Sequence, residues 1–304
     1  MSEHHHHAPA DYGRTFAIGV ALNILFVGIE AFYGWQADSL ALLADAGHNL
    51  SDVGGLLLAW GAYGAAKLKP NARHTFGWRK GSILASFLNA IILLVAMGSL
   101  GWEAIERIQS PTVVDSKVVI MVAAIGIVIN SLTAWLFLSG SQRDLNIRGA
   151  FIHMAADALV SLGVVIAGVL SLWKGWTWID PLTSIVVALV IIVGTWSLFR
   201  KSLHLLFDGV PDEIELQSVS NKLKSLRGVI DLHDLHIWAM STKQIALSVH
   251  LVVDGTDQTN DMILKSAVDL LEKQFDIEHV TIQIESIKYS EQCELNTDMS
   301  QNQG

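Results

Sequence analysis

Six long apolar stretches occupy the first two thirds of this chain of 304 residues. A helix needs about 20 apolar residues to cross the hydrocarbon core of a bilayer, and each stretch reaches that length. Backbone polar groups cannot stay unpaired in lipid, so segments of this kind cross membranes as helices. Turn and cap residues such as Asp180-Pro181 separate the stretches. We predict transmembrane helices at residues 14–36, 40–66, 80–107, 115–139, 146–173 and 178–200.

The region after the sixth stretch has a different composition. From residue 207 onward the chain contains 17 acidic and 7 basic residues, whereas the first 206 residues contain 12 and 13. This excess of negative charge argues against nucleic acid as a partner. Apolar patterns then follow in the order helix, strand, strand, helix, strand, which predicts a small α+β domain. We expect its helices at 212–226 and 261–275 and its strands at 229–240, 244–253 and 279–285.

These patterns divide the chain into regions with different expected structures. The His4–His7 run near the start is compatible with a natural metal-collecting tract and equally with a cloning remnant. The end of the chain is polar and expected to be disordered. We expect a histidine-containing tail at 1–13, an α-helical membrane domain at 14–206, an α+β domain at 207–288 and a disordered tail at 289–304.

Basic residues are concentrated on one side of the predicted membrane domain. The loop after the second predicted helix contains Lys67, Lys69, Arg73, Arg79 and Lys80, and basic residues also follow the fourth and sixth helices. Loops rich in lysine and arginine stay in the cytoplasm, which places both chain termini there. A compact chain of this kind with short loops suits a bacterial inner membrane.

Two of the predicted helices contain the same pair of ionisable residues at the same spacing. His48 and Asp52 lie in the second helix, and His153 and Asp157 lie in the fifth. Residues four apart share one helix face, so each pair offers two metal ligands. Ionisable groups inside a bilayer are costly and usually functional. Two imidazoles and two carboxylates can complete a four-coordinate site, which favours zinc or cadmium over manganese.

The same ligand atoms bind protons. A metal ion requires neutral imidazole and ionised carboxylate, so metal and protons compete for this site. Histidine titrates near neutral pH. If metal exchanges for protons here, we expect His48 and His153 to carry much of that exchange, while Asp52 and Asp157 supply negative charge.

Three further polar residues lie in the first two predicted helices. Asp45, three residues before His48, is either a hydrogen-bond partner of that imidazole or an interfacial residue, and we favour the first interpretation. Glu30 and Asn23 are seven residues apart on one helix face. We predict that they line the pore; a structural hydrogen bond between helices is the alternative.

Longer motifs occur in a fixed order along the chain. They include SLALLADAGHNLSDV, HTFGWRKGS, HMAADALVSLGV, WIDPLTS and HDLHIWAMS, followed by LSVHLVV and HVTIQIES. Together they resemble the cation diffusion facilitator family, close to its zinc-transporter branch, over residues 14–286. The resemblance implies a homodimer with six helices per protomer, a cytoplasmic ferredoxin-like domain, and export of a divalent metal in exchange for protons. It also implies that the two histidine–aspartate pairs form the transport site.

The resemblance assigns roles to residues outside these pairs as well. Related zinc transporters place cytoplasmic metal ligands at the positions of His233, His250 and Glu285, whereas His279 is one residue away from an expected ligand position. Surface histidines of a soluble domain are the alternative.

A charged pair is also implied between the membrane and cytoplasmic parts. By resemblance, Lys80 and Asp208 form an interlock there. The alternative is two unrelated surface charges, which contribute little when exposed.

The function that these observations favour is proton-coupled antiport of Zn²⁺, and also Cd²⁺, out of the cytoplasm by alternating access. Zn²⁺ is then the transported substrate and a regulatory ligand, and protons are the counter-substrate. The alternative is a membrane-tethered sensor whose cytoplasmic domain binds metal without transport. An enzyme is not expected, because the sequence lacks a nucleophile elbow, a P-loop and a dinucleotide motif. Four protein ligands would also leave no open position for a substrate water.

Overall fold

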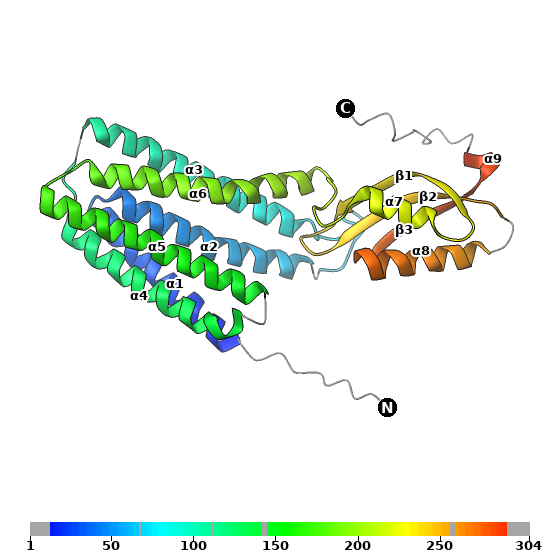
Figure 1. The fold of residues 1–304 in the computed structure, drawn as a ribbon, viewed down its shortest axis with the longest axis horizontal. Coiled ribbons are helices and arrows are strands. Elements are labelled where there is room, and N and C mark those ends of the chain that lie inside the picture. Colours follow the sequence, from blue (N-terminus) through cyan, green and yellow to red (C-terminus); the bar gives the residue numbers. More distant parts are fainter. Residues whose placement is uncertain (1–12, 67, 111, 142–144, 256–258, 291–304) are drawn as a thin grey trace. The chain divides into compact units, whose positions relative to one another are not determined.

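The first two thirds of the chain form long helices, as the apolar stretches predict (Figure 1). The computed structural model describes residues 13–66, 68–110, 112–141, 145–255 and 259–290. Five helices agree with the predicted bounds within two residues, whereas the sixth continues six residues beyond its predicted end at 200. Residues 1–12 of the predicted tail at 1–13, with its histidine run, lie outside the described residues. The helices are α1 (Gly13–Gln36), α2 (Leu40–Ala66), α3 (Gly81–Gln109), α4 (Ser116–Ser141), α5 (Leu145–Lys174) and α6 (Ile179–Leu206).

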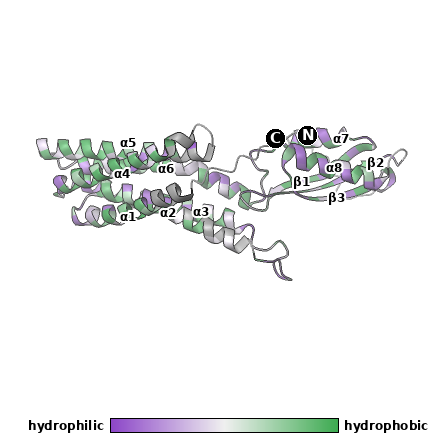
Figure 2. Cartoon of the chain, turned by 90° about the horizontal axis from the view of Figure 1, so that it is seen from below, coloured by the Kyte–Doolittle hydropathy of each residue, from purple (hydrophilic) through white to green (hydrophobic). Residues whose placement is uncertain are grey.

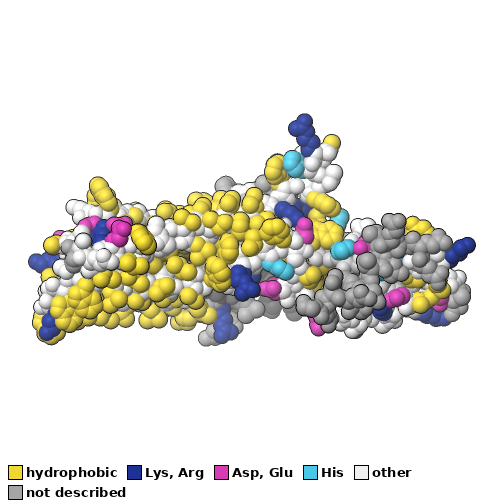
Figure 3. Space-filling model, turned by 90° about the horizontal axis from the view of Figure 1, so that it is seen from above, with side chains coloured by type: hydrophobic (Ala, Val, Ile, Leu, Met, Phe, Trp, Pro, Cys, Tyr) yellow, Lys and Arg dark blue, Asp and Glu magenta, His cyan; other side chains and the backbone are white. Residues whose placement is uncertain are grey.

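Four of these helices are long and apolar enough to cross a membrane when the described residues are considered: α3, α4, α5 and α6. The other two, α1 and α2, have 24 and 27 residues, which is also sufficient length. The helices are hydrophobic along most of their length, and apolar side chains cover the visible face of this region (Figures 2 and 3). Val193, Leu159 and Val95 are exposed by 74, 68 and 67%. Such a surface is expected against lipid and would be unusual against water.

The turn between α1 and α2 is held by side chains from other helices. Asp38 has a left-handed φ of 55°, a conformation that aspartate tolerates. The Ser39 hydroxyl donates to Oδ1 of Asp180 at 2.5 Å, and the Leu40 N–H donates to Oδ2 of Asp180 at 3.0 Å. Arg107, in the last turn of α3, binds the Asp38 carboxylate at 2.8 Å. The first turn of α2 thereby finds its hydrogen-bond partner in the carboxylate that begins α6.

Small residues let α4 lie close to its neighbours. A Cβ atom on Gly126 would lie 2.7 Å from the Phe26 ring of α1, and one on Gly168 of α5 would lie 2.8 Å from Ile120 of α4. Real side chains do not approach so closely. Helices in lipid associate through close packing at small residues, and these glycines allow it between α1, α4 and α5.

The C-terminal region has the predicted order of two helices and three strands. Strands β1 and β2 pair antiparallel, and β2 pairs parallel with β3 on its other edge. A parallel neighbour requires a crossover connection, and α8 supplies it. The elements are α7 (Leu216–Lys224), β1 (Val229–Ala239), β2 (Ile245–Val253), α8 (Asn260–Phe275), β3 (His279–Ser286) and α9 (Ile287–Ser290).

One apolar core joins these elements, and α7 and α8 lie on the same side of the sheet (Figure 2). Val219 and Leu223 of α7, Ile263 and Leu271 of α8, and Leu247 of β2 are at most 2% exposed. The periodic apolar residues that predicted these helices therefore form their buried faces.

In the C-terminal region, two differences from the sequence-based expectation have a clear place in the structure. Helix α7 begins at Leu216 rather than 212, because Pro211 and Ile214 close a turn through a 2.9 Å backbone hydrogen bond. Helix α9 includes the first two residues of the tail predicted to be disordered, and residues 291–304 lie outside the described part of the chain.

By its internal contacts the chain forms two compact units. One contains the chain up to Leu57 together with Asn89–Ser197, and the other contains Leu58–Leu88 together with Leu198 onward. The divisions fall inside α2, α3 and α6. The predicted domain boundaries at 206/207 and 288/289 stay predictions.

We predict that Asp180→Ala destabilises the helical unit. The variant leaves the Ser39 hydroxyl and the Leu40 N–H without their acceptor, and an unsatisfied buried donor costs about 1–3 kcal/mol. Thermal unfolding of the purified protein in detergent should show a lower midpoint. Asp180→Asn keeps one acceptor oxygen and should lose less; an unchanged midpoint in the alanine variant would contradict this role.

Candidate metal-binding sites

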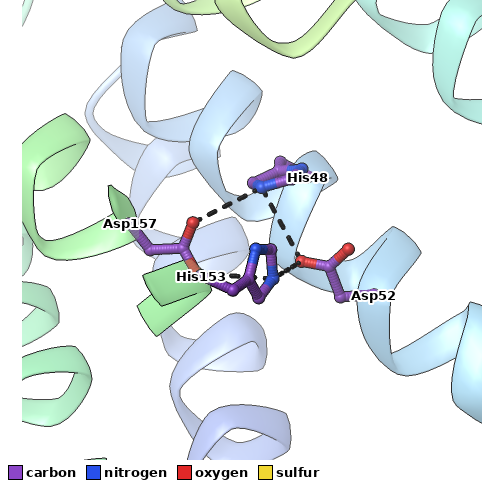
Figure 4. Close-up of side chains that lie close together, drawn as sticks. All are labelled: His48, Asp52, His153 and Asp157. Atoms are coloured by element: carbon purple, nitrogen blue, oxygen red, sulfur yellow. Dashed lines mark hydrogen bonds and ion pairs between the residues drawn. The ribbon is translucent and has the colours of Figure 1, made fainter. Parts of the chain in front are cut away.

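Helices α2 and α5 bring the two histidine–aspartate pairs together (Figure 4). Ligand atoms of His48, Asp52, His153 and Asp157 all lie within 4.8 Å of one another. The four-residue spacing aligns both members of each pair on one helix face. The two faces meet, so the four residues predicted as one site form one cluster.

Within this cluster each carboxylate lies near both imidazoles. Nε2 of His153 is 2.9 Å from Oδ2 of Asp52, and Nε2 of His48 is 3.5 Å from Oδ1 of Asp157. Within each helix, Nε2 of His48 is 3.7 Å from Oδ2 of Asp52, and Nε2 of His153 is 3.6 Å from Oδ2 of Asp157. Two nitrogens and two oxygens thus alternate around a common centre, which is the donor set of a four-coordinate zinc-like ion.

Burial of these side chains increases in one direction along the helices. His153 and Asp52 are 40 and 36% exposed, His48 is 20% exposed, and Asp157 is 4% exposed. Oδ2 of Asp157 and Nδ1 of His48 are buried without a hydrogen-bond partner among the described residues. An unpaired carboxylate oxygen is costly in an apolar bundle. A bound cation or proton at the centre of the cluster would remove the cost for Asp157.

A second set of polar groups lies on the buried side of the cluster. Asn49 of α2 donates to Oε2 of Glu30 at 3.3 Å, and Ser161 of α5 donates to Oδ2 of Asp45 at 3.1 Å. Glu30 and Asp45 are 0 and 1% exposed. Asp45 therefore bonds Ser161 rather than the imidazole of His48, so the direct contact favoured from the sequence is not present.

Asn23 of α1 is half-buried, and its amide donates to Sδ of Met154 at 3.8 Å. It contacts the helix that carries His153 without joining the four-residue cluster. Its predicted place in the pore stays a prediction.

Three ligand-type side chains also meet on the C-terminal sheet. His233 on β1 lies directly opposite His250 on β2, and Glu285 comes from β3 on the other side of β2. Nδ1 of His250 is 2.9 Å from Oε1 of Glu285, and Nε2 of His233 is 3.4 Å from Oε2. The side chains are only 14, 1 and 6% exposed for His250, Glu285 and His233. The three residues predicted from the resemblance thus form a buried metal-type cluster.

His279 is not part of this cluster. Its side chain is exposed, and its ring packs edge-on against Phe76 at 5.4 Å. It begins β3, whereas Glu285 lies near the other end of that strand. The separation along the strand explains why the structure does not bring it to the other three residues.

Asp234 lies closer to the C-terminal cluster than the sequence indicated. Strand β1 is irregular between His233 and His236, and Asp234 there has a φ of 52°. Oδ2 of Asp234 is 3.7 Å from Nε2 of His250, and Oδ1 is 2.8 Å from His236. Strand alternation alone does not predict this position, because the irregularity in β1 is not visible in the sequence pattern.

Asp231, two residues before His233, forms an ion pair with Lys224. Burial alone would raise the pKa of Asp231, but the Lys224 ammonium at 2.7 Å and the N–H of Leu232 outweigh this effect and hold that pKa below its usual value. Its negative charge is thus compensated by lysine.

Lys80 and Asp208 form the predicted ion pair, with Nζ 2.6 Å from Oδ1. The side chains are 46 and 57% exposed, so the pair contributes little by itself. Ser82, two residues after Lys80, accepts a hydrogen bond from the N–H of Thr242 at 3.1 Å. The start of α3 is therefore connected both to the segment after α6 and to the β1–β2 turn.

Comparison with known families matches nearly the whole chain. Residues 16–207 match the cation efflux transmembrane domain, and residues 211–287 match the cytoplasmic domain of cation efflux proteins. The chain belongs to the cation efflux family. The resemblance to cation diffusion facilitators is thereby confirmed, as are the helical membrane domain and the cytoplasmic α+β domain. Family membership also supports a transporter rather than an enzyme.

Curated relatives match along almost their full length. The "Cadmium, cobalt and zinc/H(+)-K(+) antiporter" of Bacillus subtilis (strain 168) is 36% identical over 93% of this chain and 92% of the relative. "Zinc transporter ZitB" of Escherichia coli (strain K12) is 35% identical over 97% of this chain and 95% of the relative. "Metal cation efflux system protein CzcD" of Cupriavidus metallidurans is 34% identical over 93% of this chain and 89% of the relative. The three names describe an antiporter, a zinc transporter and a metal cation efflux protein, and this chain is similar to each.

We predict that the two clusters bind metal independently. Equilibrium dialysis of the full-length protein against Zn²⁺ should detect two sites per chain, one for each cluster. His250→Ala removes a ligand from the C-terminal cluster and should eliminate one of them. The matched change His279→Ala should leave the stoichiometry unchanged; loss of a site in this variant would contradict the assignment.

Proposed function

We propose that this chain is a proton-coupled antiporter that exports Zn²⁺, and also Cd²⁺, from the cytoplasm by alternating access. The observation that carries this proposal is the cluster of His48, Asp52, His153 and Asp157 between α2 and α5. Neutral imidazoles and ionised carboxylates give the cluster two negative charges, which a divalent cation neutralises. The names of the relatives support both the metals and the use of protons.

Proton coupling follows from the shared ligand atoms. A proton on either imidazole blocks its nitrogen for metal, and a proton on either carboxylate removes attraction for the cation. Metal binds when the site faces the cytoplasm and loses protons. Protons displace the metal when the site faces a more acidic compartment. The proton gradient supplies the energy, and the mutual exclusion of the two ions at the site couples it to metal movement.

The burial gradient supports an inward-facing conformation. Helix α6 leads into the cytoplasmic domain, so helices that each cross once place the end of α2 and the start of α5 on the cytoplasmic side. Asp52 and His153 lie nearest those ends and are the most exposed members of the cluster. His48 and Asp157 lie farther from the cytoplasm and are more buried. An ion arriving from the cytoplasm therefore meets Asp52 and His153 first.

The C-terminal cluster is proposed as a regulatory Zn²⁺ site. His233, His250 and Glu285 provide three ligands, one fewer than a closed structural zinc site. The matching cytoplasmic domain supports a homodimer in the bilayer, and the bacterial relatives support a bacterial inner membrane. In this arrangement both termini are cytoplasmic, and the Lys80–Asp208 pair connects the start of α3 to the segment that follows α6.

A metal sensor without transport is the second candidate, favoured only by the C-terminal cluster. It does not explain why four ligands for the same ion lie between α2 and α5. Ion flux distinguishes the two functions.

We expect Asp157→Asn to abolish transport. The variant removes one of two negative charges from the cluster while keeping the size of the side chain. Reconstituted protein with a pH dye inside the vesicles should then show no Zn²⁺-driven proton movement above empty vesicles. Asp115→Asn changes an exposed aspartate at the start of α4 and should retain wild-type flux. Wild-type flux in the Asp157 variant would exclude this cluster as the transport site, and absence of flux in the wild type would favour the sensor.

The affinity of the transport site for Zn²⁺ should decrease as pH falls. Both imidazoles must be neutral to bind metal, so each displaced proton weakens binding about tenfold per pH unit below the titration of the group. Titration calorimetry between about pH 5 and 8, the range in which histidines titrate, tests this. The His250→Ala variant restricts the measurement to the membrane cluster. A pH-independent affinity would rule out competition with protons.

A further inference from the structure

Two buried carboxyl groups inside the membrane domain lie close together and belong to neither metal cluster. Asn49, which donates to Glu30 of α1, lies four residues after Asp45 on the same face of α2, so the two acidic side chains are neighbours. Both are buried, with exposed fractions of 0 and 1%. Two adjacent buried carboxylates repel each other strongly in a medium of low polarity.

The hydrogen bonds around these residues leave one place for a proton. Asn49 donates to Oε2 of Glu30, and Ser161 donates to Oδ2 of Asp45. The remaining oxygens, Oε1 of Glu30 and Oδ1 of Asp45, are buried and receive no hydrogen bond from any donor in the described part of the chain. A single proton held by the two carboxyl groups would remove one of the two negative charges and give the pair a donor for an unpaired oxygen.

Other charged groups near the pair belong to the transport cluster. Ser161, which donates to Asp45, lies four residues after Asp157 on one face of α5, and His48 lies three residues after Asp45 on α2, so both ligands are close to the pair. Asp157 favours a proton on the pair, whereas a positive charge at His48 or a metal ion beside it favours release. The state of the transport cluster therefore acts on the pair through space.

The pair lies beyond the metal ligands when the cluster is approached from the cytoplasm. Asp45 precedes His48 by three residues on α2, a rise of about 4.5 Å toward the outer end of the helix. Its partner Ser161 follows Asp157 by four residues on α5, which is the same direction. Protons that enter from the outer side therefore reach this pair before they reach the ligands.

We infer that Glu30 and Asp45 form a proton-binding site separate from the metal ligands, which holds one shared proton in the metal-free protein and releases it when a divalent cation binds at the neighbouring cluster. The proton leaves as H⁺, and the pair stays behind as two carboxylates stabilised by the Asn49 amide, the Ser161 hydroxyl and the nearby cation. When the cation leaves, the pair takes up one proton again. The shared proton depends on Glu30 and Asp45 alone; its release rests on the proposed function of the cluster.

Infrared spectroscopy of the full-length protein tests the shared proton without any metal. A protonated carboxylic acid has a C=O stretch that is resolved from ionised carboxylates. Metal-free wild type at neutral pH should show this band, and both Glu30→Gln and Asp45→Asn should lose it. Glu30→Gln retains an acceptor for Asn49 and gains an N–H that can donate to Asp45, so it replaces the proton by a fixed donor. Asp45→Asn likewise retains an acceptor for Ser161 and gains an N–H that can donate to Glu30. Asp115→Asn, at an exposed carboxylate, is the control and should keep the band.

Adding Zn²⁺ tests release. The band should disappear from the wild type, and both amide variants should release fewer protons per bound Zn²⁺ than wild type or Asp115→Asn. No acid band in metal-free wild type, or a band that persists in both variants, would overturn the shared proton. A band that persists after Zn²⁺ binds would overturn its release. Failure of the wild type to bind or transport Zn²⁺ would instead contradict the proposed function, and the metal-free spectra would still decide the shared proton.

Discussion

Ionised groups inside an apolar bundle are stable only when they meet, and this constraint organises the helical unit. Asp52 and Asp157 are each costly in hydrocarbon alone. Opposite them lie His153 and His48, at 2.9 and 3.5 Å. The meeting requires α2 and α5 to present one face each, with the four-residue spacing on both. The transport cluster is thus also a packing constraint, because any shift of one helix separates charges from their partners.

In the proposed orientation, the side of the cluster that faces away from the cytoplasm is tightly packed. A Cβ atom on Gly47 would lie 3.2 Å from Met97 of α3, and Gly126 of α4 lies against Phe26 and Ser161. Farther out, Asp180 holds the start of α2 through two hydrogen bonds. A closed outer side and an accessible inner side are what alternating access requires of an inward-facing state. Opening outward would require these close contacts to separate together.

Much of this arrangement could be predicted from the sequence, because its signals are local. Helix bounds follow from apolar length and turn residues, and the ligand pairs follow from spacing along one helix. The shared proton site could not be found in this way: Glu30 and Asp45 come from different helices, and only packing shows that they lie close together. The position of Asp234 could not be predicted for a similar reason, since an irregularity in β1 brings it near His250. His279 has a ligand-type side chain but lies at the wrong end of β3.

The two metal-type clusters differ in a way that suits different tasks. The membrane cluster offers four ligands, enough to replace the water shell of a tetrahedral ion, whereas His233, His250 and Glu285 offer three. In the proposed mechanism the membrane cluster alternates between two pH environments, so protons can expel its ion even though coordination is complete. The C-terminal cluster stays in the cytoplasm at one pH. Its occupancy can therefore follow only the cytoplasmic metal concentration, which is the quantity that a regulator of export must measure.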